Sequence, residues 1–172
     1  MNQTLHPGKL AATNFDLLSV AELLTLHVQI GEELRNRNVV RTSNNPTGDL
    51  AEYLFCRAFG WTQTPNSKSG YDACGADKRR YQIKGRRTHH RNTSRQLSAI
   101  RNLNESPFDV LAGVLFNPDF SVMRAALIPI TLVKERAAYS PHTHSHKFIL
   151  GDDVWNDPRV QDVTAHIAAA MP

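Results

Sequence analysis

The chain has 172 residues, of which 41% are hydrophobic and 21% are charged, and its formal net charge is +4 at pH 7. This composition is typical of a soluble globular protein, and no apolar run approaches the ~18–20 residues of a membrane span. Cys56 and Cys74 form neither a disulfide framework nor a zinc-binding pair. The N-terminal residues lack the order of a signal peptide, so we expect a cytoplasmic protein without a membrane partner. We expect one domain over residues 1–172, with residues 1–15 loosely ordered.

Two helices are predicted in the first third of the chain. The residues Ser19 to Glu22 form a capping box, and apolar residues at helical spacing continue this helix to about Asn36. His27 lies on its apolar face, which favours a core or boundary histidine over a metal ligand. The stretch DLAEYLFCRAF predicts a second helix, which Gly60 ends.

The stretch YDACGADKRRYQIKGRR, residues 71–87, predicts a β-hairpin with its turn at residues 75–77. Residues 88–106 are polar and irregular, with a short helix expected at residues 94–101. The apolar runs FDVLAGVLF and VMRAALIPI then predict two strands joined by a turn at Asn117.

The last third predicts a short helix over ITLVKERAA, a strand over HSHKFIL and a terminal helix over DDVWNDPRVQDVTAHIAAAM. There are no internal repeats. Helices, then about five strands with a helix among them, then a last helix predict an α/β or α+β domain. Its mixed central sheet should be flanked by helices.

Positive charge is concentrated in one block of the sequence. Residues 78–101 hold nine of the twenty Lys and Arg residues and no Asp or Glu, which leaves eleven basic against sixteen acidic residues elsewhere. Such a block is typical of a protein that binds a polyanion, and the alternative is a solvated basic face. The candidate contacts to nucleic acid are Arg80, Arg86, Arg87, Arg91 and Arg95.

The predicted hairpin also carries a set of polar side chains suited to catalysis. On a strand, Gln82 and Lys84 share one face while Tyr81 and Ile83 point to the other, toward the core. Asp72 lies on the neighbouring arm and can reach the same cleft. A carboxylate and an amide oxygen are hard ligands for Mg²⁺, and lysine can orient a water molecule or neutralise a phosphate. This combination favours phosphodiester hydrolysis.

The segments GDLAEYL, GYDACGADKRRYQIKGRR and the basic block resemble the PD-(D/E)XK nuclease superfamily, in the Mrr-like variant with a QxK motif. The resemblance covers roughly residues 48–87 and implies a restriction-endonuclease-like fold. It implies that Asp72 is the metal-ligating aspartate, Gln82 the second ligand position and Lys84 the catalytic lysine. It further implies that Glu52, from the preceding helix, joins Asp72 and Gln82 in holding Mg²⁺ or Mn²⁺.

Gln82 departs from the acidic residue that many members of the superfamily carry at this position. The neutral amide weakens the metal site by one charge, which makes Glu52 more necessary if the site is catalytic. Asp49, one helical turn before Glu52, is interpreted as a second candidate or as a helix cap.

The expected function is therefore that of a magnesium-dependent endonuclease acting on DNA, with RNA as the alternative substrate. A non-catalytic nucleic-acid-binding module with the same fold is the competing hypothesis, and a homodimer is left open. Asp72 has an alternative as a turn residue, Lys84 as a surface contact to phosphate, and Glu52 as an exposed helix charge.

Two further sequence patterns are weaker candidates for a functional site. The histidines of HTHSHK, which are His142, His144 and His146, predict either a zinc site on one face of a strand or a polar sheet edge. Ser67 and Ser69 are candidate donors to phosphate.

Overall fold

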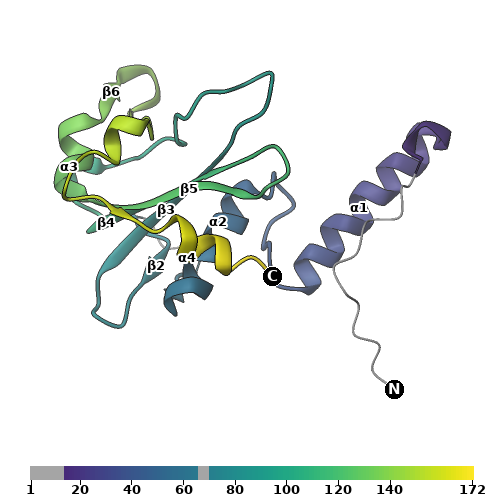
Figure 1. The fold of residues 1–172 in the computed structure, drawn as a ribbon, viewed down its shortest axis with the longest axis horizontal. Helices are drawn as coiled ribbons and strands as arrows, with labels where there is room; N and C mark the ends of the chain where they lie inside the picture. Colours follow the sequence, from purple (N-terminus) through teal and green to yellow (C-terminus); the bar gives the residue numbers. More distant parts are fainter. Residues whose placement is uncertain (1–13, 66–69) are drawn as a thin grey trace.

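The computed structural model describes residues 14–65 and 70–172, and within them six strands form one mixed sheet (Figure 1). The strand order is β1-β2-β3-β4-β5-β8. β3 and β4 run parallel, and the other neighbouring pairs are antiparallel. The strands are β1 (Thr62–Gln63), β2 (Ala73–Cys74), β3 (Arg80–Arg87), β4 (Val110–Phe116), β5 (Val122–Pro129) and β8 (Gln161–Asp162). The expected α+β fold with a mixed central sheet is confirmed.

The sheet is covered by apolar residues on both faces. On one face, α2 (Thr47–Phe59) and α4 (Thr164–Ala169) pack over β3, β4 and β5, with Phe55 fully buried between them. The other face is covered by α3 (Ile130–Arg136) and by apolar residues of the segments 97–108 and 148–154. β6 (Ala138–Ser140) and β7 (Ser145–Lys147) form a separate two-stranded sheet. The described residues also form the short 3₁₀ helices η1 (Phe15–Leu17), η2 (Leu103–Glu105), η3 (Pro141–Thr143) and η4 (Asp152–Val154).

The contact between α2 and β3 depends on a glycine. A Cβ atom at Gly85 would lie 2.7 Å from the Thr47 carbonyl oxygen and 3.0 Å from the Ala51 Cβ. Only a residue without a side chain therefore lets the helix approach the strand this closely. Gly60, with φ of 65°, ends α2 in the left-handed conformation as predicted.

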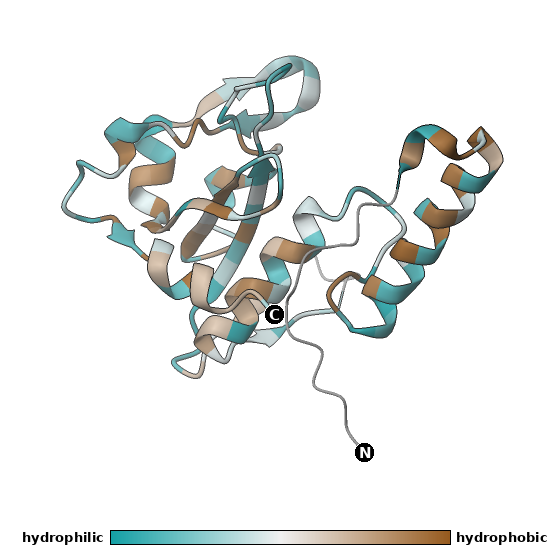
Figure 2. Cartoon of the chain, turned by 45° about the vertical axis from the view of Figure 1, so that its right-hand side comes forward, coloured by the Kyte–Doolittle hydropathy of each residue, from teal (hydrophilic) through white to brown (hydrophobic). Residues whose placement is uncertain are grey.

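The first predicted helix is present as α1 (Val20–Asn36), and both bonds of its capping box are formed between Ser19 and Glu22. Its surroundings differ from the expectation. None of its residues is buried, and it projects from the rest of the molecule (Figure 1). Hydrophobic residues recur along its length (Figure 2). The interpretation of His27 as a core or boundary residue is wrong, because His27 is exposed.

Three predicted elements differ in the structure. The short helix expected at residues 94–101 is replaced by extended chain, because the amides of Leu97 and Ile100 donate to the carbonyls of Phe148 and His146. The strand expected over residues 144–150 is limited to β7. The terminal helix expected over residues 152–171 is divided into η4, β8 and α4.

Side-chain packing and sheet pairing explain the division of the terminal segment. Arg124 lies 3.9 Å over the ring of Trp155, and β8 pairs with the outer side of β5. Pro158, which removes one backbone donor, lies between these two contacts. Within the described residues, no helix is long and apolar enough to cross a membrane.

Candidate active site on the hairpin of β2 and β3

β3 separates an apolar face from a polar one. Tyr81 and Ile83 are buried in the cluster that also contains α2, whereas Gln82 and Lys84 are partly buried and alternate with them. The tight turn between β2 and β3 closes through a hydrogen bond from the Lys78 amide to the Gly75 carbonyl, 2.9 Å long. The hairpin therefore presents Gln82 and Lys84 on the face opposite to α2.

Asp72 lies directly before β2 and joins the polar side chains of the hairpin. Its Oδ2 atom accepts hydrogen bonds from the Ile83 amide, at 2.7 Å, and from the Gln82 side-chain amide. Burial raises the pKa of Asp72, and the positive charge of Lys84 opposes this effect. The structure thus brings Asp72, Gln82 and Lys84 together around one carboxylate.

Glu52 comes from α2 and is only 16% exposed in its side chain. Its Oε2 atom forms an ion pair with Arg41 and accepts a hydrogen bond of 2.8 Å from the Gln63 side chain. Burial raises the pKa of Glu52, and the negative charge of Asp72 raises it further. Glu52 is therefore near Asp72 but is bonded to Arg41 and Gln63, not to the Asp72–Gln82 pair.

Arg41 is a site residue that the sequence analysis missed. Its guanidinium pairs with Glu52 and also donates to the Thr64 carbonyl at 3.3 Å. Asp49 holds the loop that carries it, because its Oδ2 atom accepts from the amides of Arg41 and Thr42 at 2.9 and 2.8 Å. Asp49 is thus engaged in anchoring this loop. A single arginine among turn-forming residues carries no pattern that would have identified it.

The hairpin carries carboxylate and amide oxygens, which are the hard ligands that Mg²⁺ prefers. This ion binds through one or two carboxylates and keeps several waters. In the described part of the chain, no three His, Cys, Asp or Glu side chains gather closely enough to hold a metal ion. Both hydrogen bonds to Asp72 end on Oδ2, which leaves Oδ1 as a hard oxygen donor. The donor set would fit an ion held by Asp72 and several waters, whereas Glu52 is engaged with Arg41 and Gln63.

Within the described residues, some arginines of the basic block form ion pairs and others do not. Arg80 pairs with Asp109 at 2.8 Å, and Arg95 pairs with Asp152 at 2.7 Å, so part of their charge is neutralised. Arg86 and Arg87 instead donate to the backbone carbonyls of Ser94 and Pro118. Arg91 is exposed to solvent.

Arg86 and Arg87 lie beside a polar hollow on the strand that carries Lys84. The hollow has a volume of about 270 Å³, and its other lining residues are Asn45, Thr47, Gly85, His89 and Asn92. The hollow begins one residue beyond Lys84 along β3 and includes Thr47 of α2.

Among the described residues, the remaining candidates do not form a second site. His142 lies in η3, His144 has φ of 44° and His146 lies in β7, so the three histidines do not share one strand face as predicted. Burial raises the pKa of the Cys56 thiol to about 11, which keeps it protonated at neutral pH. Ser67 and Ser69 lie outside the described residues.

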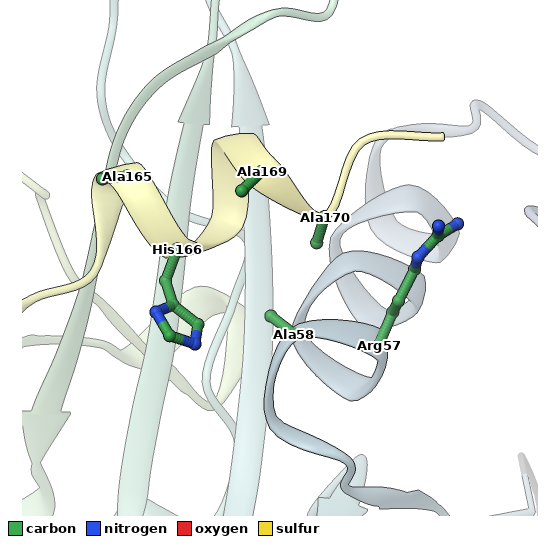
Figure 3. Close-up of a pocket in the computed structure, with 6 residues that line it drawn as sticks. All are labelled: Arg57, Ala58, Ala165, His166, Ala169 and Ala170. Atoms are coloured by element: carbon green, nitrogen blue, oxygen red, sulfur yellow. The ribbon is translucent and has the colours of Figure 1, made fainter.

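A larger hollow, of about 410 Å³, lies between α2 and α4, away from the hairpin (Figure 3). Three of its lining residues are Ala165, Ala169 and Ala170. The imidazole of His166 stacks on Phe59 with ring centroids 5.0 Å apart. Arg57 and His166 are the lining residues that carry polar side chains.

Comparison with models of known protein families and with curated proteins finds no match to the chain.

Proposed function

We propose that this protein is a metal-dependent nuclease that hydrolyses phosphodiester bonds in DNA at the hairpin of β2 and β3. The proposal depends on the partly buried Asp72 carboxylate, which is bonded to Gln82 and lies within electrostatic reach of Lys84. A structural hairpin needs no such trio, because Tyr81 and Ile83 already supply its core contacts.

Each residue has a role that follows from its chemistry. Mg²⁺ bound at the site would stabilise negative charge on the phosphate and lower the pKa of a water molecule. Asp72 would hold the ion, and its orientation is fixed by the Ile83 amide and by Gln82. Lys84 would orient the attacking water or neutralise the phosphate. Arg86 and Arg87 would bind the phosphates of the same strand.

The test is cleavage of plasmid and linear DNA, and of RNA, with Mg²⁺ or Mn²⁺ and with EDTA as the metal-free control. We expect Asp72→Ala to abolish cleavage. Lys84→Ala should cost several kcal/mol of transition-state stabilisation, at ~1.4 kcal/mol for each tenfold loss of rate. Gln82→Glu should raise activity at low Mg²⁺, because it adds a charge to the metal site.

A matched control is Asp77→Ala, which removes an exposed carboxylate from the turn of the same hairpin and should leave cleavage unchanged. Thermal melting must show that all variants are folded. If the wild-type protein cuts neither DNA nor RNA with any divalent ion, the nuclease proposal fails.

A nucleic-acid-binding module without cleavage is a second candidate, and the Arg41–Glu52 ion pair favours it, because Arg41 already neutralises this carboxylate. In that case the affinity for DNA should fall steeply with salt, since bound phosphates release counterions. Replacing Arg86, Arg87 and Arg91 with alanine should weaken binding to unrelated sequences. Arg57→Ala, an exposed arginine on α2, is the control. Binding without cleavage would favour the module, and no binding at low salt would exclude both functions.

A further inference from the structure

The rest of the described chain buries none of the apolar residues of α1. The exposed fractions along η1 and α1 are 60% for Phe15, 79% for Leu17, 73% for Val20, 63% for Leu24, 59% for Val28 and 60% for Ile30. Together these side chains expose on the order of 500 Å² of apolar surface. This area is as large as the largest apolar patch on a typical monomeric protein, and such patches are often functional.

The two halves of α1 differ in what lies beside them. Val28, Ile30 and Leu34 in the C-terminal half form one side of a groove with a volume of about 680 Å³. Its other side is formed by the body of the protein through Val40, Pro46 and Phe120. The N-terminal half, with Val20 and Leu24, takes no part in this groove. The C-terminal half of α1 therefore lines a groove, and the N-terminal half exposes an apolar surface to solvent.

We propose that a second copy of this chain covers this surface through an antiparallel pairing of two α1 helices. In such a pair the N-terminal half of each helix enters the groove beside the C-terminal half of the other. A two-fold axis between the copies then buries the groove and the N-terminal apolar surface of both chains. An isologous dimer requires this self-complementarity.

The size of the surface and one glycine support a second copy as the occupant. The apolar area, together with its polar rim, approaches the roughly 800 Å² that each partner buries in a standard interface. Gly31 lines the groove and destabilises an isolated helix relative to alanine. Among the described residues, no atom lies closer than 3.8 Å to a Cβ atom built there, so this position leaves room for the close approach of another helix.

The test measures the mass of the full chain by sedimentation equilibrium over a range of concentrations. We expect a dimer, and Leu24→Lys with Val28→Lys should raise its dissociation constant about tenfold or more. The matched control places the same two lysines one residue further on, at the exposed positions Thr25 and Gln29 of the polar face, and should retain the dimer. Circular dichroism must show that both variants keep the fold.

The antiparallel arrangement predicts a specific crosslink. His27 lies at the middle of the apolar face and would oppose its own copy, whereas Val20 would oppose Leu34. Mild oxidation should therefore crosslink His27→Cys but not Val20→Cys, with the wild-type chain as the control for Cys56 and Cys74.

Three results would overturn the proposal. The first is a wild-type chain that stays monomeric at every concentration. The second is a dimer that the Leu24 and Val28 variant leaves intact, which would place the interface elsewhere. The third is a monomer in which the α1 amides exchange slowly, because residues 1–13 would then cover the apolar face instead of a second copy.

Discussion

The two long helices of this protein resemble each other in sequence pattern and differ in what they contact. α1 and α2 both carry apolar residues at helical spacing, and both end as their sequences predict. Yet α2 buries Leu50, Ala51, Leu54 and Phe55, and α1 buries none of its residues. Helical periodicity therefore identifies an apolar face without identifying what will cover that face.

The difference also decides where the candidate chemistry lies. α2 is fixed against β3 by the Gly85 contact, so Glu52 is held close to the hairpin and to Asp72. The carboxylates of α1 instead bond to residues of the same helix or its cap, as Glu32 does with Arg35 and Glu22 with Ser19. A helix with a buried face can position a side chain for catalysis, whereas α1 presents an apolar face with no buried residue.

The largest expected effect comes from truncating the same residue type in each helix. Leu54→Ala should lower the free energy of unfolding by ~2–5 kcal/mol, because it leaves a cavity beside a fully buried face. Leu24→Ala should change it by less than ~0.5 kcal/mol in dilute solution, because Leu24 is 63% exposed. Urea denaturation measures both values. Equal losses would show that α1 packs against the body of its own chain.

A second pair of variants examines the close contact between α2 and β3. Gly85→Ala should lower the free energy of unfolding by ~1–3 kcal/mol, because the added methyl group overlaps the Thr47 carbonyl. It should also reduce any cleavage activity, since α2 must move and carry Glu52 with it. Gly48→Ala, at the start of α2, has nothing within 4 Å of its new Cβ atom and should be neutral or slightly stabilising. Tolerance of both changes would contradict the tight packing.

Local sequence patterns predicted those parts of the fold that depend on neighbours in the chain. The capping box at Ser19, the stop at Gly60 and the alternation of Tyr81 with Gln82 are all present in the structure. Errors occurred where distant segments compete with local preference. Leu97 and Ile100 lie in a polar stretch, but they are fully buried because their backbone pairs with residues 146–148.

In the candidate site too, contacts within the hairpin could be predicted from the sequence, whereas contacts between distant segments could not. Asp72, Gln82 and Lys84 were recognisable together because a hairpin brings them close through local geometry. Arg41 was not recognisable, because it reaches Glu52 only after α1, its loop and α2 have taken their positions. No local pattern encodes a contact between residues that meet through tertiary packing alone.

The smallest expected effect is the pH dependence of the stability that one glutamate from each helix contributes. It compares the two helices most directly, because the two glutamates should respond to pH with opposite signs. Burial raises the pKa of Glu52, whereas the hydrogen bonds with Ser19 lower the pKa of Glu22. A raised pKa in the folded state stabilises the protein below the ordinary value of 4.5, and this contribution is lost as pH rises through the raised pKa. A lowered pKa has the opposite sign, and its contribution is lost as pH falls below 4.5.

The two signs can be separated with the variants Glu52→Gln and Glu22→Gln, which remove one titration each. The stability advantage of the wild-type protein over Glu52→Gln should shrink as pH rises from 4.5 toward neutrality. Its advantage over Glu22→Gln should shrink as pH falls below 4.5, and it should appear in the helicity of α1 and not in the unfolding of the core. Urea denaturation and circular dichroism at a series of pH values measure both trends. If Glu52 showed the same sign as Glu22, then its pairing with Arg41 would outweigh its burial, and Glu52 would act as a permanently charged partner of that arginine.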